Sequence, residues 1–441
     1  MVGEGEAAAG FAAAFHEGFG AVLPALPKRR GPRPRVPLAR VLAALVFHFM
    51  NAAGTLAEHF AQRYEDPLTD SSLSERRTRL PWEVFTELMR LGLRPLAQAT
   101  TQPAAFWRSW RLVALDGTQF SLTNTPQVKA TVRKAKARRG RAAFAKVTTS
   151  VLLELGLHNP LAAAIGRQGQ SEWALALELL AQLPAQALLL ADRLYGCAAF
   201  LAAVQAACQK AGSHFLVRAR PRIRVQMIKR CKDGSRLVRV PVQQKGNQRV
   251  IVQWLEWREI RGRVQRAGHR AQELRLWTSL LDPQTAPARE LAELYAQRWE
   301  HELYYRELKR QLRKGEVLQS HTLETGAQEI AAVVLASALL ARERARAAGG
   351  QIPVLRISFI KTLELLRPLW LTLALGGDLL SARQKQQLTD RFLDCARRYV
   401  TPRRKRPRSC PRAVRRAVSP WPRLRRNHSW NGPIHFKILS A

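Results

Sequence analysis

One succession of predicted elements, between residues 110 and 220, limits the folds open to this chain more than any other feature. Stretches rich in strand-forming residues are separated by two stretches whose apolar residues recur at helical spacing. Strands and helices in this succession predict an α/β layer architecture. The predicted elements are strands over 110–122, 146–157 and 160–166, a helix over 171–183, a strand over 186–192, a helix over 197–212 and a strand over 214–220.

A stretch of different character interrupts this core. Residues 219–271 alternate basic and apolar residues around turn signals at Asp233-Gly234 and Gly246-Asn247, which predicts an antiparallel β-strand insertion. The core is therefore predicted in two parts, residues 106–218 and residues 272–325, and the second part carries a helix from Leu294 to Leu312.

The regions before and after the core are predicted to be helical. In the N-terminal domain, residues 1–105, Ser72 and Glu75 fit a capping box at the start of a short helix. That helix displays Arg76, Arg77 and Arg79. It suits docking on DNA, although an ordinary solvated helix start gives the same pattern.

The C-terminal region, residues 326–441, combines helices with a basic tail. Its apolar run at 330–341 is too short to span a bilayer, so we expect a buried helix and no membrane partner. No acid follows Asp394, which indicates either a flexible arm against phosphates or an unstructured solubility tail.

The charge of the chain predicts a polyanionic partner. Lys and Arg number 72 against 33 Asp and Glu, a net charge of +39. A small compacting protein would also be basic, but 441 residues with 46% hydrophobic residues can bury a sizeable core. Between Asp116 and Glu154 there is no acid, and this stretch is predicted to track a DNA backbone. Its basic residues include Arg133, Lys134, Lys136, Arg138, Arg139 and Arg141.

The cysteines and the N-terminus bear on localisation. The five cysteines are scattered without a C-x-x-C pair, so neither a zinc site nor a disulfide framework is expected. The first residues show no secretory signal, and we expect a cytoplasmic protein.

Two aspartates end predicted buried strands, Asp116 in ALDGTQ and Asp192 in LLLADRLYG. Carboxylates at the ends of adjacent buried strands are costly to ionise together unless a cation lies between them. Oxygen ligands favour Mg²⁺, or Mn²⁺, over zinc. With a third carboxylate they would hold two metal ions that activate water and stabilise the leaving oxygen in phosphodiester cleavage.

Glu302 is the candidate for the third carboxylate because of its neighbours. At about 100° per residue, Tyr295, Arg298, Glu302 and Lys309 fall on one side of a helix. The glutamate can ligate metal, the two bases can hold phosphates, and the phenol can hydrogen-bond or stack. An ordinary surface face with an Arg298–Glu302 pair, worth about 0.3–0.5 kcal/mol, is the alternative.

These motifs together resemble the DDE transposases of insertion-sequence family four. The resemblance rests on the spacing Tyr-x2-Arg-x3-Glu-x6-Lys, on DGT at 116–118, on ADRLYG at 191–196, and on a β-stranded insertion between the second aspartate and the glutamate. One departure is Leu194, where the family tends to have glycine.

The resemblance implies an RNase H-like mixed sheet with flanking helices, interrupted by the insertion. Asp116, Asp192 and Glu302 would hold two Mg²⁺ ions, while Tyr295, Arg298 and Lys309 would contact phosphates at the transposon ends. It further implies nicking, hairpin formation and strand transfer into target DNA by a bacterial, nucleoid-associated protein that acts as a homodimer on double-stranded DNA. A DNA-binding protein without chemistry and a nuclease without strand transfer are the alternatives.

Other residues have more ordinary interpretations. Relatives stack an aromatic residue of the insertion on a base, and either Trp254 or Trp257 could do so here, or both could pack within the insertion. Asp282 is expected in a turn, and Glu300 and Glu307 are expected to be solvated. Glu293 is a weaker alternative to Glu302.

Overall fold

The structure is a computed structural model, and it describes residues 36–402 and 435–438 with short gaps. The gaps are residues 37, 52, 65–67, 133, 135, 138–139, 168, 245–246, 266–270, 314, 316 and 377–378. The chain forms two compact units, each assembled from stretches that are far apart in the sequence. The first unit comprises residues 1–105, 117–179 and 303–401, and the second comprises residues 106–116, 180–302 and 402–441.

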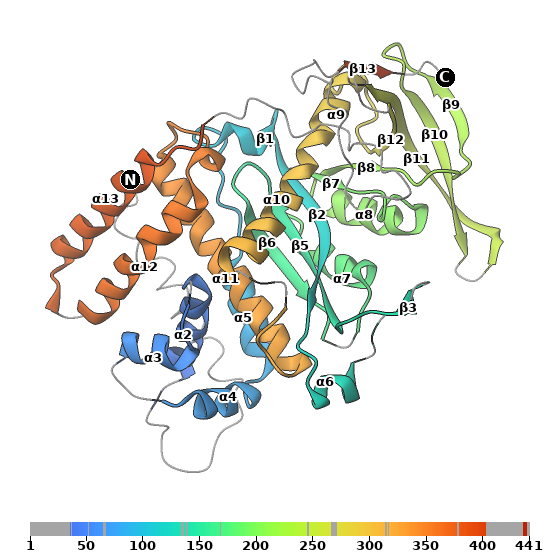
Figure 1. The fold of residues 1–441 in the computed structure, drawn as a ribbon. Helices are drawn as coiled ribbons and strands as arrows, with labels where there is room; N and C mark the ends of the chain where they lie inside the picture. Colours follow the sequence, from blue (N-terminus) through green and yellow to red (C-terminus); the bar gives the residue numbers. More distant parts are fainter. Residues whose placement is uncertain are drawn as a thin grey trace, which may run out of the picture. The chain divides into compact units, whose positions relative to one another are not determined.

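The first unit is mainly helical (Figure 1). Its helices are α2 (Leu38–Met50), α3 (Leu56–Tyr64), α4 (Asp70–Thr78), α5 (Trp82–Gly92), α6 (Pro126–Thr131), α7 (Glu172–Leu179), α11 (Leu323–Ala348), α12 (Phe359–Gly376) and α13 (Ala382–Arg398). Its strands are the antiparallel pair β5 (Lys146–Glu154) and β6 (Asn159–Ile165), and the short hairpin β3 (Lys136–Ala137) and β4 (Gly140–Arg141). The described residues before and after the core thus form helices, and strands lie near 146 and 160 as predicted.

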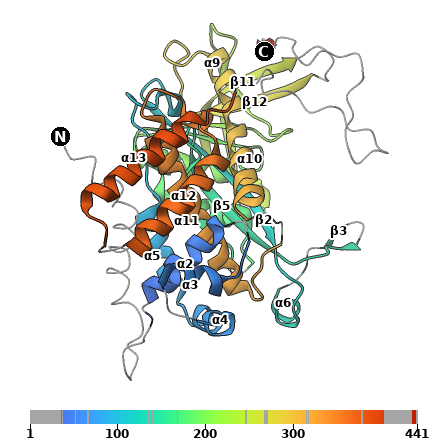
Figure 2. The same ribbon diagram turned by 60° about the vertical axis from the view of Figure 1, so that its left-hand side comes forward.

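Helix α11 forms the core of the first unit. Thr322 and Thr325 make a reciprocal capping box at its start, and Gly349 ends it in the left-handed conformation. Among the described residues α11 is the one helix that is long and apolar enough to cross a membrane, and most of it is buried inside the protein. The buried helix predicted around 330–341 is thus confirmed. In Figure 2, α12 and α13 lie beside one another near α11.

The start of α4 differs from its prediction. Thr69, not Ser72, is the N-cap residue, and its side chain accepts from the Ser72 backbone N–H at 3.2 Å. Glu75 pairs with Arg79 one turn later and does not reach back to the start of the helix. Ser72 therefore lies inside the helix, because the chain offers a threonine as cap three residues earlier.

The second unit is built on a mixed sheet. The first half of strand β2 (Trp110–Ser121) belongs to this unit. Strands β7 (Ala187–Ala191) and β8 (His214–Arg218) run parallel to β2. The order continues through β12, β11, β10 and β9, which are antiparallel. These four strands are β12 (Gln272–Thr278), β11 (Asn247–Gln265), β10 (Arg236–Gln244) and β9 (Gln226–Arg230). Helix α8 (Ala198–Lys210) packs on β8 and β10. The predicted α/β class is confirmed, and the described residues between 226 and 265 form antiparallel strands.

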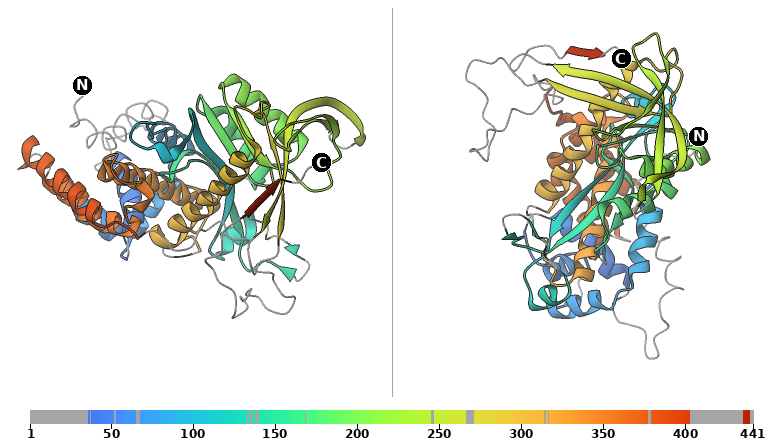
Figure 3. Two further views of the ribbon diagram at one scale, coloured as in Figure 1. Left: turned by 90° about the horizontal axis from the view of Figure 1, so that it is seen from above. Right: turned by 90° about the vertical axis from the view of Figure 1, so that its right-hand side faces the viewer.

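Strand β13 (His435–Ile438) adds to the insertion and was not predicted. It pairs antiparallel with β11 from Gly262 to Gln265, as Figure 3 shows beside the long strands of the insertion. The same stretch of β11 pairs with β12, so β13 occupies the opposite edge of the strand. Within the predicted basic tail, residues 403–434 lie outside the described residues.

The helix predicted from Leu294 to Leu312 is not one regular helix. The chain passes through α9 (Ala288–Leu294), a 3₁₀ turn (Tyr295–Arg298), α10 (Trp299–Arg306) and a π-helical turn (Glu307–Leu312). A uniform 100° per residue therefore does not describe this segment. Single π turns inside helices occur often at functional sites.

Candidate active site

Asp116 and Asp192 lie where the parallel pairing of β2 and β7 ends. In this pair, Leu115 and Ala191 are directly opposite each other, and an aspartate follows each of them. Asp192 follows the carboxyl end of β7, as the sequence predicted. The prediction that Asp116 ends its strand is wrong, because β2 continues to Ser121 beyond its pairing with β7.

Tyr295 is buried beside the end of β7. Its hydroxyl donates to the carbonyl oxygen of Ala191 at 3.2 Å, one residue before Asp192. Burial, with Asp192 and Asp116 nearby, raises the pKa of the Tyr295 phenol, so it stays a neutral donor. In this structure Tyr295 holds the end of β7 and does not reach outward.

Arg298 lies between two of the three acids. Its Nη1 donates to Asp116 Oδ2 at 3.3 Å and its Nη2 to Glu302 Oε1 at 3.2 Å. Its side chain is 14% exposed, against 16% for Asp116 and 33% for Glu302. Burial works to lower the pKa of Arg298, but Tyr295, Asp116, Asp192 and Glu302 outweigh it, and the pKa is raised. The second unit thus collects all three predicted acids around one guanidinium.

The donor set suits a divalent cation. Asp116, Asp192 and Glu302 offer oxygen ligands alone, which Mg²⁺ and Mn²⁺ prefer. Among the described residues, no three such side chains already stand in a geometry that would hold a metal ion. Arg298 spans Asp116 and Glu302, so a cation bound by these two carboxylates would take over contacts that the guanidinium makes here.

Lys309 belongs to the first unit, where it contacts the continuation of β2. Its Nζ donates to Thr118 Oγ1 at 2.7 Å and to the Gln119 carbonyl oxygen at 2.8 Å, and lies 5.0 Å from the centre of the Phe120 ring. Two residues of the DGT motif, Gly117 and Thr118, lie in this unit, and their surroundings are defined. Thr118 receives the lysine, and Gly117 has no side chain because a Cβ there would lie 2.2 Å from Cδ of Glu172.

The basic residues of α4 have different surroundings. Arg77 points into the first unit, where its Nη2 donates to Ser320 Oγ and to the Thr325 carbonyl oxygen, and burial lowers its pKa. This arginine joins α4 to the start of α11. Arg76 is partly exposed, and Arg79 is exposed and paired with Glu75. Helix periodicity could have separated Arg77 from the other two.

The basic stretch between Asp116 and Glu154 is described in part. Lys134 donates through Nζ to the Ala143 carbonyl oxygen at 2.7 Å. Arg133, Arg138 and Arg139 lie outside the described residues, and for Lys136 and Arg141 the structure describes the backbone of β3 and β4 only.

The two tryptophans of the insertion have opposite surroundings. Trp257 is fully buried, packs against Phe215 and Trp277, and donates to Gln205 Oε1 at 2.7 Å. Trp254 is 40% exposed on β11. Of the two candidates for base stacking, only Trp254 is accessible.

Of the remaining acids, one does not match its prediction. Asp282 accepts from the backbone N–H groups of Gln284 and Thr285, as expected of a turn residue. The prediction that Glu307 is solvated is wrong: its Oε2 lies 2.7 Å from Nδ1 of buried His158 and its Oε1 3.7 Å from Arg344. The π turn that starts at Glu307 rotates its side chain from the predicted face. Glu293 forms an exposed pair with Arg289.

A tight loop follows Asp192. The Asp192 carboxylate accepts from the Leu194 N–H, and Arg220 donates to the Leu194 carbonyl oxygen. Gly196 lies so close to β8 that a Cβ there would be 2.0 Å from the Arg218 carbonyl oxygen. Leu194, the departure from the family pattern, is accommodated with its side chain 40% exposed.

Two aspartates beside the β2–β7 pairing and a helical glutamate thus lie around one guanidinium, the arrangement that the resemblance implied. Residues 107–339 match the model of the transposase DDE domain, and because this is more than half of the chain, the chain belongs to that family. Members of the family use divalent metal ions.

Among individual proteins, the chain is similar to transposase InsG for insertion sequence element IS4 of Escherichia coli (strain K12). The two are 27% identical over 270 residues, which is 58% of this chain and 59% of that relative. The resemblance to insertion-sequence family four is thereby confirmed. Among solved structures, piggyBac transposase in a synaptic complex with hairpin DNA matches with a TM-score of 0.45 and 8% identity, covering 87% of this chain and 80% of that one.

Proposed function

We propose that this protein is an active cut-and-paste DNA transposase that cleaves at transposon ends and joins the freed 3′-OH to target DNA. The observation that carries the proposal is the convergence of Asp116, Asp192 and Glu302 on Arg298. A decayed copy that only binds DNA has no need to keep three acids at such a point, because unneutralised carboxylates destabilise a partly buried site.

The three carboxylates would hold two Mg²⁺ ions, for which Mn²⁺ could substitute. When bound, divalent metal activates a water and stabilises the leaving oxygen. Arg298, released from Asp116 and Glu302, then binds a phosphate beside the scissile bond. Tyr295 keeps the end of β7 in place through the Ala191 carbonyl. This exchange of partners lets the same arginine serve both the free and the DNA-bound protein.

The residues that contact the DNA carry positive charge or an exposed ring. Lys309, Arg76, Arg79 and Lys134 contact phosphates, and Trp254 stacks on an unpaired base. Further phosphate contacts are proposed from the sequence of the basic stretch alone, by Arg133, Lys136, Arg138, Arg139 and Arg141. Arg77 is left out because its guanidinium is bonded within the protein. The sheet that carries the acids is RNase H-like, cleavage passes through a hairpin intermediate, and the protein works as a homodimer on double-stranded DNA.

The test is a cleavage assay with Mg²⁺ and linear DNA that carries the ends of the element encoding this chain. An active transposase gives excised and joined products. A protein that only binds gives a shifted band with intact strands, and a plain nuclease gives cut strands without joining. Either of the last two results refutes the proposal.

Substitutions of single acids, with a control substitution nearby, test whether Asp116 and Glu302 form the catalytic site. Asp116→Asn and Glu302→Gln should abolish cutting while end binding persists. Glu293→Gln is the control, since Glu293 lies on the preceding helical turns in an exposed pair with Arg289. Full cleavage by Glu302→Gln would show that the site is wrongly assigned. Binding should also weaken steeply between low and physiological salt.

A further inference from the structure

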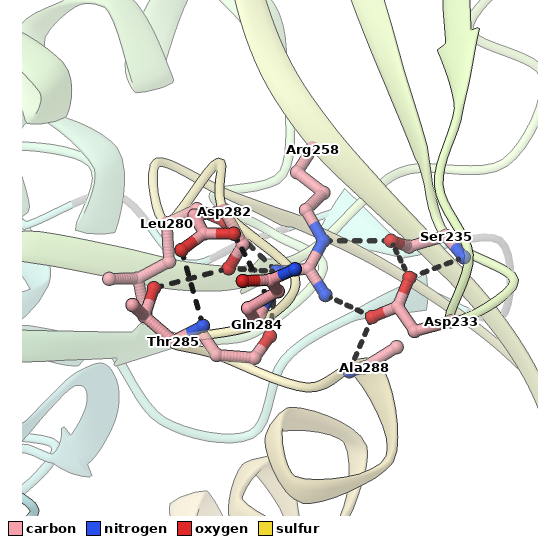
Figure 4. A network of polar contacts seen from close by, with 9 residues as sticks. Asp233, Ser235, Arg258, Leu280, Asp282, Gln284, Thr285 and Ala288 are labelled. Carbon is pink, nitrogen blue, oxygen red and sulfur yellow. Dashed lines mark hydrogen bonds and ion pairs between the residues drawn. The ribbon is translucent and has the colours of Figure 1, made fainter.

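A buried polar network joins the insertion to the segment that carries Arg298 and Glu302. Figure 4 shows Arg258 of β11 at its centre, with Asp233, Ser235 and Ala288 on one side and Leu280, Asp282 and Thr285 on the other. The Arg258 side chain is fully buried. A buried guanidinium is stable only where its donors find acceptors, so each contact of this arginine matters.

Arg258 uses donors in two directions. Toward the β9–β10 turn, Nε donates to Ser235 Oγ at 2.8 Å and Nη2 to Asp233 Oδ2 at 2.5 Å. Toward the loop before α9, Nη1 donates to carbonyl oxygens at 2.6–3.3 Å. These carbonyls belong to Leu280, Asp282 and Ala286.

Asp233 then binds the start of α9 directly. Its Oδ2 also accepts from the backbone N–H of Ala288 at 2.9 Å, while its Oδ1 accepts from Ser235. Pro287, the N-cap residue of α9, makes no side-chain cap. An aspartate from the insertion therefore caps this helix in place of a local residue, and a negative charge there suits the helix dipole.

The anchored segment leads without a break to the site. From Ala288 the chain continues through α9 and the 3₁₀ turn into α10, which carries Glu302, roughly 20 Å along the axis at about 1.5 Å per residue. The ion pairs Arg108–Glu290 and Arg289–Glu293 on α9 are 44–76% exposed and so contribute little. The buried network is the stronger restraint on where this segment begins.

We propose that Asp233 and Arg258 are positioning residues: through the start of α9, the β insertion fixes the placement of Arg298 and Glu302. This inference rests on the proposed function for its catalytic consequence. The insertion then has a structural task in addition to any contact with DNA. Misplacement of a reacting group by about 1 Å can cost on the order of 100-fold in rate, so loosening the anchor should appear in turnover more than in binding.

Two variants weaken the anchor. Asp233→Asn keeps the size of the side chain and removes its charge. Ala288→Pro removes the N–H that Asp233 accepts, at a first helical position where proline is tolerated, and adds ring carbons at a buried position. The extended backbone of Pro287, with ψ of 139°, suits a following proline. Glu256→Gln is the matched control, because it breaks the exposed Arg239–Glu256 pair of the same hairpin.

The experiment follows hydrogen–deuterium exchange of peptides from residues 288–306 in the full chain, together with Mg²⁺-dependent cleavage. Both variants should speed exchange in these peptides, lower turnover about 10-fold or more, and raise the Mg²⁺ concentration for half-maximal cleavage. End binding should stay unchanged, and Glu256→Gln should match the parent protein.

The outcomes separate the two claims. If the parent protein does not cut DNA, the proposed function fails, while the exchange data still decide whether the anchor exists. If exchange and cleavage of both variants equal those of the parent, the positioning role is refuted. Should Asp233→Asn fail to fold, Ala288→Pro alone decides by the same two readouts.

Discussion

The side-chain amine of Lys309 lies 2.7 Å from the hydroxyl of Thr118, in the motif that begins with Asp116. The lysine also donates to the Gln119 carbonyl oxygen, so its amine is held beside this motif. A cationic side chain attracts phosphate, and Thr118 limits the directions from which Lys309 can act.

Lys309→Ala should therefore weaken binding to transposon-end DNA by about 3–10-fold at moderate salt. The slope of the logarithm of the binding constant against that of salt concentration should fall by about 1, because one fewer counterion is released. Titrations at several salt concentrations measure both. Lys361→Ala serves as control, since Lys361 is paired with Glu364 on the surface of the first unit. An unchanged slope for Lys309→Ala would exclude the phosphate contact.

Replacement of Arg298 should make the metal-free protein less stable. Without the guanidinium, Asp116 and Glu302 lose their shared partner and repel each other. We expect Arg298→Ala to lower the unfolding temperature in EDTA by at least about 2 °C. Added Ca²⁺ or Mg²⁺ should restore more of it than in the parent protein, since a cation then neutralises the acids. Equal responses to metal in variant and parent would contradict this account, and Arg239→Ala is the surface control.

Substitution of Gly196 should disturb the loop after Asp192. A Cβ at this position meets the Arg218 carbonyl oxygen at 2.0 Å and the Ala219 Cα at 2.9 Å, and neither backbone atom can move alone. We expect Gly196→Ala to lower the free energy of unfolding by about 1–3 kcal/mol and to slow cleavage. Denaturant titration measures the first effect. Gly315→Ala is the matched control, because a Cβ there would lie 4.0 Å from the Arg313 and Val317 carbonyl oxygens; equal losses in both variants would refute the steric argument.

Acid should destabilise the first unit through a histidine pair. His48 and His59 are buried with their Nδ1 atoms 2.8 Å apart, and burial lowers the pKa of both below the ordinary 6.5. The neighbouring charged groups are Glu58, Arg77, Glu329 and Arg367. As pH falls through about 6.5, the unfolded chain takes up protons before the folded protein does, so stability is complete above that pH and is lost below it.

Thermal unfolding between about pH 8 and about pH 5.5 tests this expectation. His59→Gln should flatten the dependence by removing one of the two titrating groups. The exposed His321→Gln should leave the slope as it is in the parent protein. If His59→Gln keeps the full slope, other groups carry the acid sensitivity.

Much of the second unit was predictable because local signals and tertiary needs agree there. Strand β2 is apolar where it is buried and paired with β7, and Asp192 follows a run of five buried residues. The apolar run before each aspartate, a property of the sequence, was enough to place both aspartates where the pairing of β2 with β7 ends. The helical glutamate was found by spacing, and its link to Asp116 through Arg298 required the fold.

What was missed depends on contacts distant in sequence. Nothing near Arg77 indicates that Ser320 and Thr325 accept its bonds, and nothing near Glu307 indicates His158. The π turn escapes a helical wheel because it changes the period inside an otherwise helical segment. The capping of α9 by Asp233 is of the same kind, since its two partners lie on separate elements.

Strand β13 makes the insertion sheet dependent on residues remote from it in sequence. Gly262 to Gln265 of β11 lie beyond the stretch that pairs with β10, and β13 supplies their partner on that edge. A protein shortened before His435 would present these backbone groups uncovered, and an uncovered strand edge invites pairing with another molecule. Self-association after such a truncation would accordingly arise from a lost strand, with no change to any acid of the catalytic site.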